Sequence, residues 1–318
     1  MGAGKKFFLK KVIALIGTLL LVSVIAFFLF QIVPGDPVTS MLGTEYTPER
    51  AEQLREEMGL KDPVILRYVH WLTDFVQGDF GTSYKYKIPV SKLIGEKLPV
   101  TVSLAVMSLL MIVVSSVPLA IFMSRFGKRK ISRFFDILNQ SVMAVPSFFL
   151  GILIIILFGL VLKWFTPGGY IDYRQDITGF LGYLWPAALA VAIPKTAMLV
   201  KFLKQSILRE MDSDYVRTAY SKGAGQSRVL FGHVLRNALM PALTLLGMII
   251  AEIMAGSIVV EQVFNLPGLG VILVSSVANR DFPVVQAIVI YIALIVIVTN
   301  CIVDILYHVT DPRVNYEK

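Results

Sequence analysis

Six apolar stretches alternate with polar segments along the chain. They lie at about 12–33, 100–123, 137–162, 183–203, 240–262 and 284–306 and are rich in Leu, Ile and Val. Each is long enough to cross a bilayer as a helix, which takes roughly 20 residues. None shows the strict alternation of apolar and polar positions that a membrane β-barrel strand requires. The pattern therefore predicts an all-α membrane protein with six transmembrane helices.

The basic residues predict the topology. Segments 1–11, 124–136, 201–240 and 307–318 hold most of the 30 Lys and Arg residues in under a quarter of the chain. Basic flanks of membrane helices stay on the cytoplasmic side, so we expect both termini in the cytoplasm. The expected sections are then, in order, the N-terminus with the first helix (1–33), an extracytoplasmic segment (34–99), the five-helix core (100–306) with an inner loop at 204–240, and a cytoplasmic tail (307–318).

The extracytoplasmic segment carries signals for a small helical cap. Pro48 suits the first position of a helix over 48–58, with Thr47 as its cap and Gly59 as its end. A second helix is expected from Pro63 to Val76, with Gly78 as its terminator. Its apolar-aromatic face holds Tyr68, Trp71, Leu72 and Phe75, and GDFGTS at 78–83 predicts a turn. The prolines and glycine of VPGDP at 33–37 are expected to stop the first helix. Packing and partner contact both remain open as roles for this segment.

Composition argues against a soluble protein, a nucleic-acid-binding protein, an intrachain disulfide and a metal site. Hydrophobic residues make up 56% of the chain and charged residues 16%, against about 25% charged in a typical soluble protein. The net charge of +8 lies in the flanks of membrane helices, so it does not indicate nucleic-acid binding. Cys301 is the only cysteine, which excludes an intrachain disulfide. The three histidines, His70, His233 and His308, are too dispersed to predict a metal site.

The inner loop has a helical pattern. A helical wheel over 207–221 places Ile207, Leu208, Met211, Tyr215 and Ala219 on one arc and charged residues on the other. The glycine-containing stretch 223–225 breaks the helix, and a second run from Gln226 carries Val229, Leu230, Val234 and Leu235. Two short helices around a glycine turn could serve as a rigid lever for a soluble partner. An ordinary amphipathic surface helix explains the same pattern equally well.

Specific motifs carry a family resemblance. DYVRTAYSKGAG at 214–225, followed by LRNALMPALT at 235–244, resembles the coupling-loop motif of ABC importer permeases. The motif's Glu is absent, but the RTA-x-x-KG form is usual in the dipeptide/oligopeptide/nickel branch, B-type subunit. The other pieces similar to that branch occur in order: VPGDP, GDFGTS, LPVT at 98–101, GSIVVEQVFNLPGLG at 256–270, DFPVVQA at 281–287 and DPR at 311–313.

The resemblance implies a type I ABC importer permease fold in a bacterial or archaeal cytoplasmic membrane. It implies a second permease subunit, two cytoplasmic ATPases that bind ATP and Mg²⁺, and an extracytoplasmic solute-binding protein. The implied substrate is a peptide, with nickel chelates or another small solute as the alternative. The loop would insert into a cleft on one ATPase. The residues expected to couple are Asp214, Tyr215, Arg217, Thr218, Ala219, Lys222 and Gly223.

The chain carries no sign of chemistry of its own. It lacks the phosphate-binding loop G-x-x-x-x-G-K-[ST], so no cofactor is expected on it and it is not expected to be an enzyme. Ionisable residues inside membrane spans are functional candidates because burying charge in lipid is costly. Lys195 and Glu252 are hypothesised to line the translocation pathway, pairing with each other or contacting the charged ends of a peptide. A structural ion pair is the alternative, and Asp304 lies near the inner boundary.

Two other functions would leave different patterns in the sequence. A stand-alone secondary transporter or channel predicts inverted repeats and discontinuous helices, and no convincing repeat is present. An intramembrane enzyme requires a catalytic pair such as Ser/Lys or two Asp within spans, and Lys195 has no evident partner of that kind. Co-purification with an ATPase, together with ATP-dependent uptake, would separate the importer from both.

Overall fold

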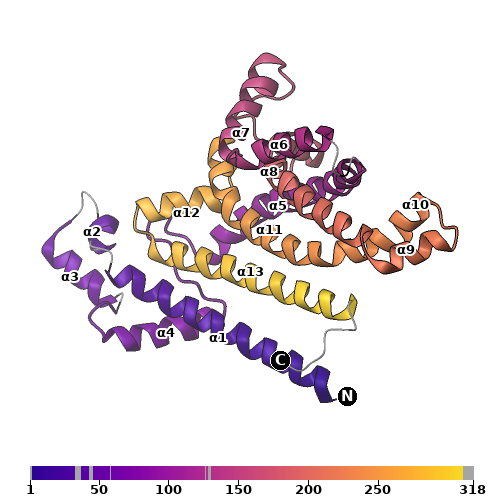
Figure 1. Cartoon of the computed structure of the whole chain (residues 1–318). Coiled ribbons are helices and arrows are strands. Elements are labelled where there is room, and N and C mark those ends of the chain that lie inside the picture. The colour runs from indigo at the N-terminus through magenta and orange to yellow at the C-terminus, as the bar shows by residue number, and fades with distance from the viewer. Residues whose placement is uncertain are drawn as a thin grey trace. The chain divides into compact units, whose positions relative to one another are not determined.

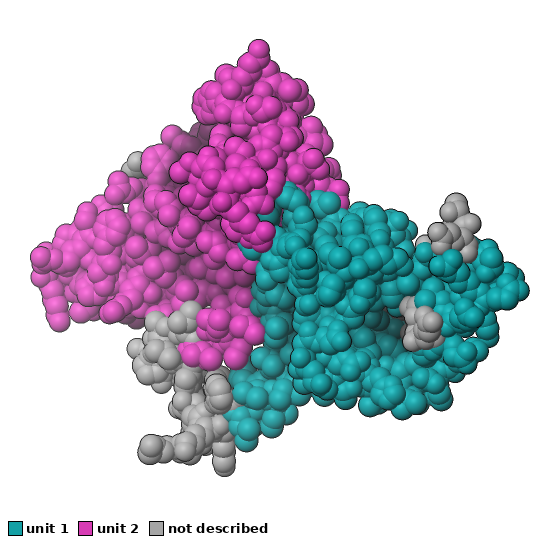
Figure 2. All heavy atoms as spheres, turned by 180° about the vertical axis from the view of Figure 1, so that it is seen from behind, with its two compact units in different colours: residues 1–101, 267–297 teal, residues 102–266, 298–318 magenta. Residues whose placement is uncertain are grey.

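The computed structural model describes residues 2–32, 37–42, 46–57, 59–125, 127 and 130–310. Within them, regular structure is helical apart from an antiparallel bridge between Thr82 and Pro89. The chain forms two compact units, 1–101 with 267–297 and 102–266 with 298–318 (Figure 2).

Five helices are long and apolar enough to cross a membrane in the described part of the chain (Figure 1). They are α1 (Gly2–Ile32), α5 (Val90–Ser124), α8 (Ile177–Met211), α11 (Leu235–Val263) and α13 (Phe282–Thr310). Each contains one of the predicted apolar stretches, apart from Val33, which lies outside the described residues. Most helices run past the predicted bounds. For example, α5 starts at Val90 because Leu93 and Ile94 are buried and extend its packed face.

The apolar stretch at 137–162 differs from the single span that the sequence predicts. It is divided between α6 (Lys130–Ala144) and α7 (Ser147–Ile154), which continues as the π-helical η2 (Ile155–Val161). The two parts are bent by 93°. Pro146 causes the break, because it lacks an N–H and disfavours helical backbone at Val145. Counting this bent pair as one span raises the number from five to six.

Helix α8 is the centre of the second unit. It packs against α6, α7 and α11, and its buried residues include Ala187, Ala188, Ala190, Ala192 and Ala197. Small residues let membrane helices approach closely. The Tyr183 hydroxyl donates a hydrogen bond to the carbonyl oxygen of Phe264 (2.9 Å) and accepts one from Gly168 N (2.9 Å). This bond joins the start of α8 to the residue that follows α11.

The first unit contains the helices after α1. These are α2 (Pro37–Leu42), α3 (Pro48–Glu57) and α4 (Val64–Val76). The predicted helices at 48–58 and 63–76 are confirmed, although Met58 lies outside the described residues. Residues 33–36 of VPGDP, which are expected to stop the first helix, also lie outside them. Thr47 Oγ1 accepts a hydrogen bond from Arg50 N (3.3 Å), and Gly59 ends α3 with φ +62°.

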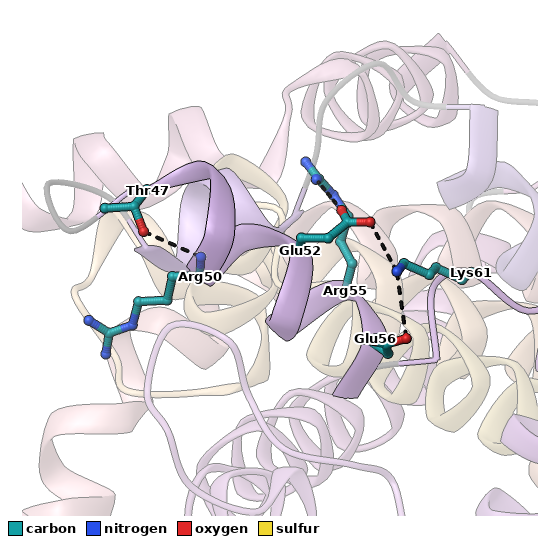
Figure 3. A network of polar contacts seen from close by, with 6 residues as sticks. All are labelled: Thr47, Arg50, Glu52, Arg55, Glu56 and Lys61. Atoms are coloured by element: carbon teal, nitrogen blue, oxygen red, sulfur yellow. Dashed lines mark hydrogen bonds and ion pairs between the residues drawn. The ribbon is translucent and has the colours of Figure 1, made fainter.

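Ion pairs surround the end of α3 (Figure 3). Lys61 Nζ lies 3.0 Å from Glu52 Oε1 and 3.7 Å from Glu56 Oε1, and Arg55 Nη1 lies 3.2 Å from Glu52 Oε2. Hydrogen bonds from Lys61 and Arg55 hold the pKa of Glu52 below its usual value. These side chains are largely exposed, so the pairs contribute little stability.

The predicted aromatic face of α4 is confirmed. Tyr68, Trp71, Leu72 and Phe75 are half-buried, whereas most of the helix is exposed. The rings of Tyr68 and Trp71 lie 5.4 and 5.5 Å from the ring of Phe27 in α1, and the Tyr68 hydroxyl is hydrogen-bonded to Ser23 Oγ (2.8 Å). The segment after α1 is therefore anchored on α1 itself.

The predicted turn at 78–83 is also confirmed, and a buried carboxylate anchors the residues that follow it. Gly78 and Gly81 have φ of +88° and +77°. Asp281 is fully buried between α12 (Leu269–Ala278) and α13. It accepts hydrogen bonds from Ser83 Oγ (2.5 Å), Tyr84 N (2.9 Å) and Lys85 N (3.3 Å). Burial and the nearby charge of Asp281 raise the pKa of Tyr84 to about 12, so this phenol stays neutral.

We predict that Asp281→Ala destabilises the first unit. The substitution removes three hydrogen bonds and leaves buried donors without an acceptor, which costs about 3 kcal/mol in the free energy of unfolding. Denaturant titration of the purified protein in detergent measures the loss. Asp79→Ala is the matched control, because Asp79 is exposed and accepts one hydrogen bond, from Gly81 N; its loss should stay below about 1 kcal/mol. Equal losses in the two variants would contradict the anchoring role.

Candidate functional site

The inner loop forms two short helices between α8 and α11 (Figure 1). They are α9 (Asp214–Ser221) and α10 (Gln226–Val229), and the π-helical η3 (Leu230–Val234) leads directly into α11. The glycine turn and the helical run from Gln226 are as the sequence predicts. The single helix predicted over 207–221 is wrong, because α8 ends at Met211 and a new helix starts after Ser213.

Local hydrogen bonding explains this break. Ser213 has extended backbone at φ −77° and ψ 154°, and its Oγ donates to the carbonyl oxygen of Glu210 (2.6 Å). Ser and Asp side chains compete in this way with helix continuation. The restart changes which face is buried: Val216 is 1% exposed, whereas Tyr215, expected on the buried arc, is 36% exposed.

Buried side chains pack α9 against α10 and its continuation η3, which in turn contacts α8 and α11. Val216 of α9 is buried, as are Val229, Leu230 and Val234 of the following helices. The Tyr215 hydroxyl donates to Glu210 Oε2 at the end of α8 (2.6 Å). Partial burial of the ring, and then this hydrogen bond, raise the pKa of Tyr215 above its usual value. The ring therefore links α9 to α8 as a neutral donor.

The opposite side of α9 is open to solvent. We call the exposed residues Asp214, Arg217, Thr218 and Lys222 the α9 surface. Asp214 and Arg217 approach to 3.6 Å, but their side chains are 99% and 76% exposed, so the pair stabilises the helix only weakly. Gly223 ends the helix with φ +82°, in open space. Ala219 is half-buried. All seven predicted coupling residues thus lie on one short helix and its C-terminal turn.

The predicted pathway residues lie apart from the α9 surface. Lys195 of α8 donates a hydrogen bond to Glu252 Oε2 of α11, and the side chains are 26% and 42% exposed. The structure thus brings this pair together and leaves both groups accessible. Asp304 lies in α13, and its side chain is outside the described part of the structure. No cluster of three or more His, Cys, Asp or Glu that could hold a metal occurs among the described residues.

Sequence reasoning missed a buried polar contact between α6 and α8. Lys204 is 5% exposed, and its Nζ donates to Ser132 Oγ (2.7 Å) and Asp136 Oδ1 (2.5 Å). Ser132, Asp136, Asn139 and Gln140 form one polar stripe at helical spacing on α6. That spacing could have identified the contact.

Known proteins and family models match almost the whole length of the chain. A model of the binding-protein-dependent transport system inner membrane component matches residues 116–316, and a model of its N-terminal part matches residues 5–105. A putative peptide transport system permease protein of Brucella suis is 37% identical over 97% of this chain and 98% of its own length. The oligopeptide permease AppB of Bacillus subtilis is 36% identical over 98% and 99%. The glutathione permease GsiC of Salmonella typhimurium is 34% identical over 97% and 98%.

These matches extend across both units and include the inner loop, Lys195 and Glu252. The resemblance to ABC importer permeases that the motifs indicate is confirmed. The chain belongs to the family of binding-protein-dependent transport system inner membrane components.

Proposed function

We propose that the chain is a permease subunit of an ATP-driven ABC importer and forms half of a translocation pathway for peptides. The observation that carries this proposal is the near full-length similarity to permeases named for peptide, oligopeptide and glutathione transport. These names favour a peptide over a nickel chelate. The partners would be a second permease subunit, two ATPases that bind ATP and Mg²⁺, and an extracytoplasmic solute-binding protein.

The proposed topology has six spans with both termini in the cytoplasm, in a type I permease fold. It counts the bent α6–α7 pair as one span. Its support is the concentration of Lys and Arg in 1–11, 124–136 and 201–240. Residues 34–99 are then extracytoplasmic, 100–306 are the core, and 307–318 are a cytoplasmic tail.

The α9 surface is proposed as the docking site for one ATPase. A motor that pushes on a membrane bundle needs a stiff element to push against, and burial of Val216 and Val229 provides this stiffness. Motion of α9 passes to α8 through Tyr215 and to α11 through η3. Because α8 and α11 carry Lys195 and Glu252, displacement of α9 would switch the access of that pair between the two membrane faces.

Lys195 and Glu252 are proposed to bind the two charged ends of a peptide. An ammonium and a carboxylate on neighbouring helices match the carboxylate and ammonium of a zwitterionic ligand. Both are partly exposed, so a ligand can reach them. The alternative is an ion pair that only holds α8 against α11.

We predict that Gly223→Pro uncouples the importer. Proline cannot adopt the φ of +82°, and it removes the N–H that Gly223 donates to the Tyr220 carbonyl oxygen (2.9 Å). Membrane insertion and ATPase activity should remain, while uptake in proteoliposomes falls by about tenfold or more. Gly225→Pro is the matched control, since its φ of −69° suits proline, and it should keep near-normal uptake. Unchanged uptake in Gly223→Pro would rule out this lever.

We predict that the double variant Lys195→Met/Glu252→Gln assembles but transports poorly. Neutralising both partners together avoids leaving a single unpaired charge, so complex yield should match the wild type. Loss of charge-assisted contacts with the peptide ends should raise the KM for an unmodified dipeptide by about tenfold or more. A peptide blocked at both ends should be transported alike by wild type and variant. A normal KM in a fully assembled double variant would leave only the structural role.

A further inference from the structure

Helix α6 forms one wall of a cleft in the second unit. The cleft has a volume of about 690 Å³, within the usual range for a small-molecule site. The end of α8 forms the opposite wall. The lining residues used below are Lys130, Arg133, Asp136, Lys201 and Lys204.

The cleft is strongly cationic. Among the described residues, four basic side chains line it with one carboxylate, that of Asp136, which Lys204 already binds. Lys204 is buried, and two of its three N–H donors are directed to Ser132 and Asp136. Lys201 is exposed and held in place by a hydrogen bond to Gln140 Oε1 (2.7 Å), and Arg133 is also exposed. This arrangement suits an anion that enters from the surface.

An apolar groove adjoins the cleft. The groove has a volume of about 670 Å³ and runs between α5, α6 and α8. Its walls are mainly apolar and include Phe135, Leu138 and Val142, and it shares Asn139 with the cleft. A free phosphate would use only the cationic cleft. A phospholipid would use both, with its headgroup in the cleft and an acyl chain in the groove.

We propose that the cleft and the groove together bind one anionic phospholipid, with its phosphate between Arg133 and Lys201. Basic pockets between membrane helices on the cytoplasmic side are suited to such headgroups. The basic start of α6 then has a second role beside orienting the chain in the membrane, because Lys130 and Arg133 hold a lipid against α8, the helix that leads into α9.

Native mass spectrometry of the assembled transporter tests this proposal. The complex is released from nanodiscs that contain equal amounts of phosphatidylglycerol and phosphatidylcholine. The wild type should retain phosphatidylglycerol in preference, and Arg133→Gln/Lys201→Gln should reduce that retention by roughly tenfold. Lys92→Gln removes an exposed lysine outside the cleft and should leave retention unchanged. Equal retention of phosphatidylglycerol by the wild type and the double variant would overturn the proposal. Absence of retained phosphatidylglycerol in the wild type would also overturn it, and would indicate that the second permease subunit fills the groove.

A competition arm separates the two possible sources of the phosphate. Glycerol 3-phosphate and inorganic phosphate offer the same anionic group without acyl chains. At millimolar concentration neither should displace phosphatidylglycerol from the complex. Displacement by either one would assign the cleft to a free phosphate and overturn the lipid assignment.

Discussion

The close packing of α8 against α6, α7 and α11 is the constraint on which the second unit depends. Alanines at 187, 188, 190, 192 and 197 allow this packing, and the Tyr183 hydroxyl fixes the start of the helix. With little hydrophobic driving force between helices in lipid, such steric fit and a few polar bonds determine the arrangement. The ion pair, the basic cleft and the connection to α9 all involve α8, so its position determines the geometry of each.

The inner loop is connected to two membrane helices, as the proposed lever requires. One side of α9 is fixed by Val216 and by the bond from Tyr215 to Glu210, while the other side presents charged and hydroxyl groups to solvent. The short link through 212–213 joins it to α8, and α10 and η3 join it to α11. On the proposed coupling role, a force on α9 would reach two membrane helices at once, and these are the helices joined by Lys195 and Glu252.

The sequence predicted the elements that strong local signals define. Apolar length identified the long helices, and Thr47, Pro48 and Gly59 placed α3, because caps and glycines act locally. Prediction from the sequence was wrong or silent where contacts between distant parts of the chain determine the structure. The wheel over 207–221 assumed one helical phase, but Ser213 restarts the helix and buries Val216 instead of Tyr215. The sequence shows Pro146, but the size of the bend, 93°, depends on how the neighbouring helices pack. The contacts of Asp281 with 83–85 join residues nearly 200 positions apart, which a local pattern does not reveal.

Site-directed cross-linking of the assembled transporter can show whether the α9 surface docks on an ATPase. Cys301 is replaced by Ser, and single cysteines are placed at Thr218 on that surface and, as a control, at exposed Lys163. We expect a short bifunctional cross-linker to join Thr218→Cys to the ATPase subunit, with a yield that changes when ATP is added, and Lys163→Cys to give no such product. An ATPase cross-link from Lys163→Cys, or none from Thr218→Cys in an active complex, would contradict this docking.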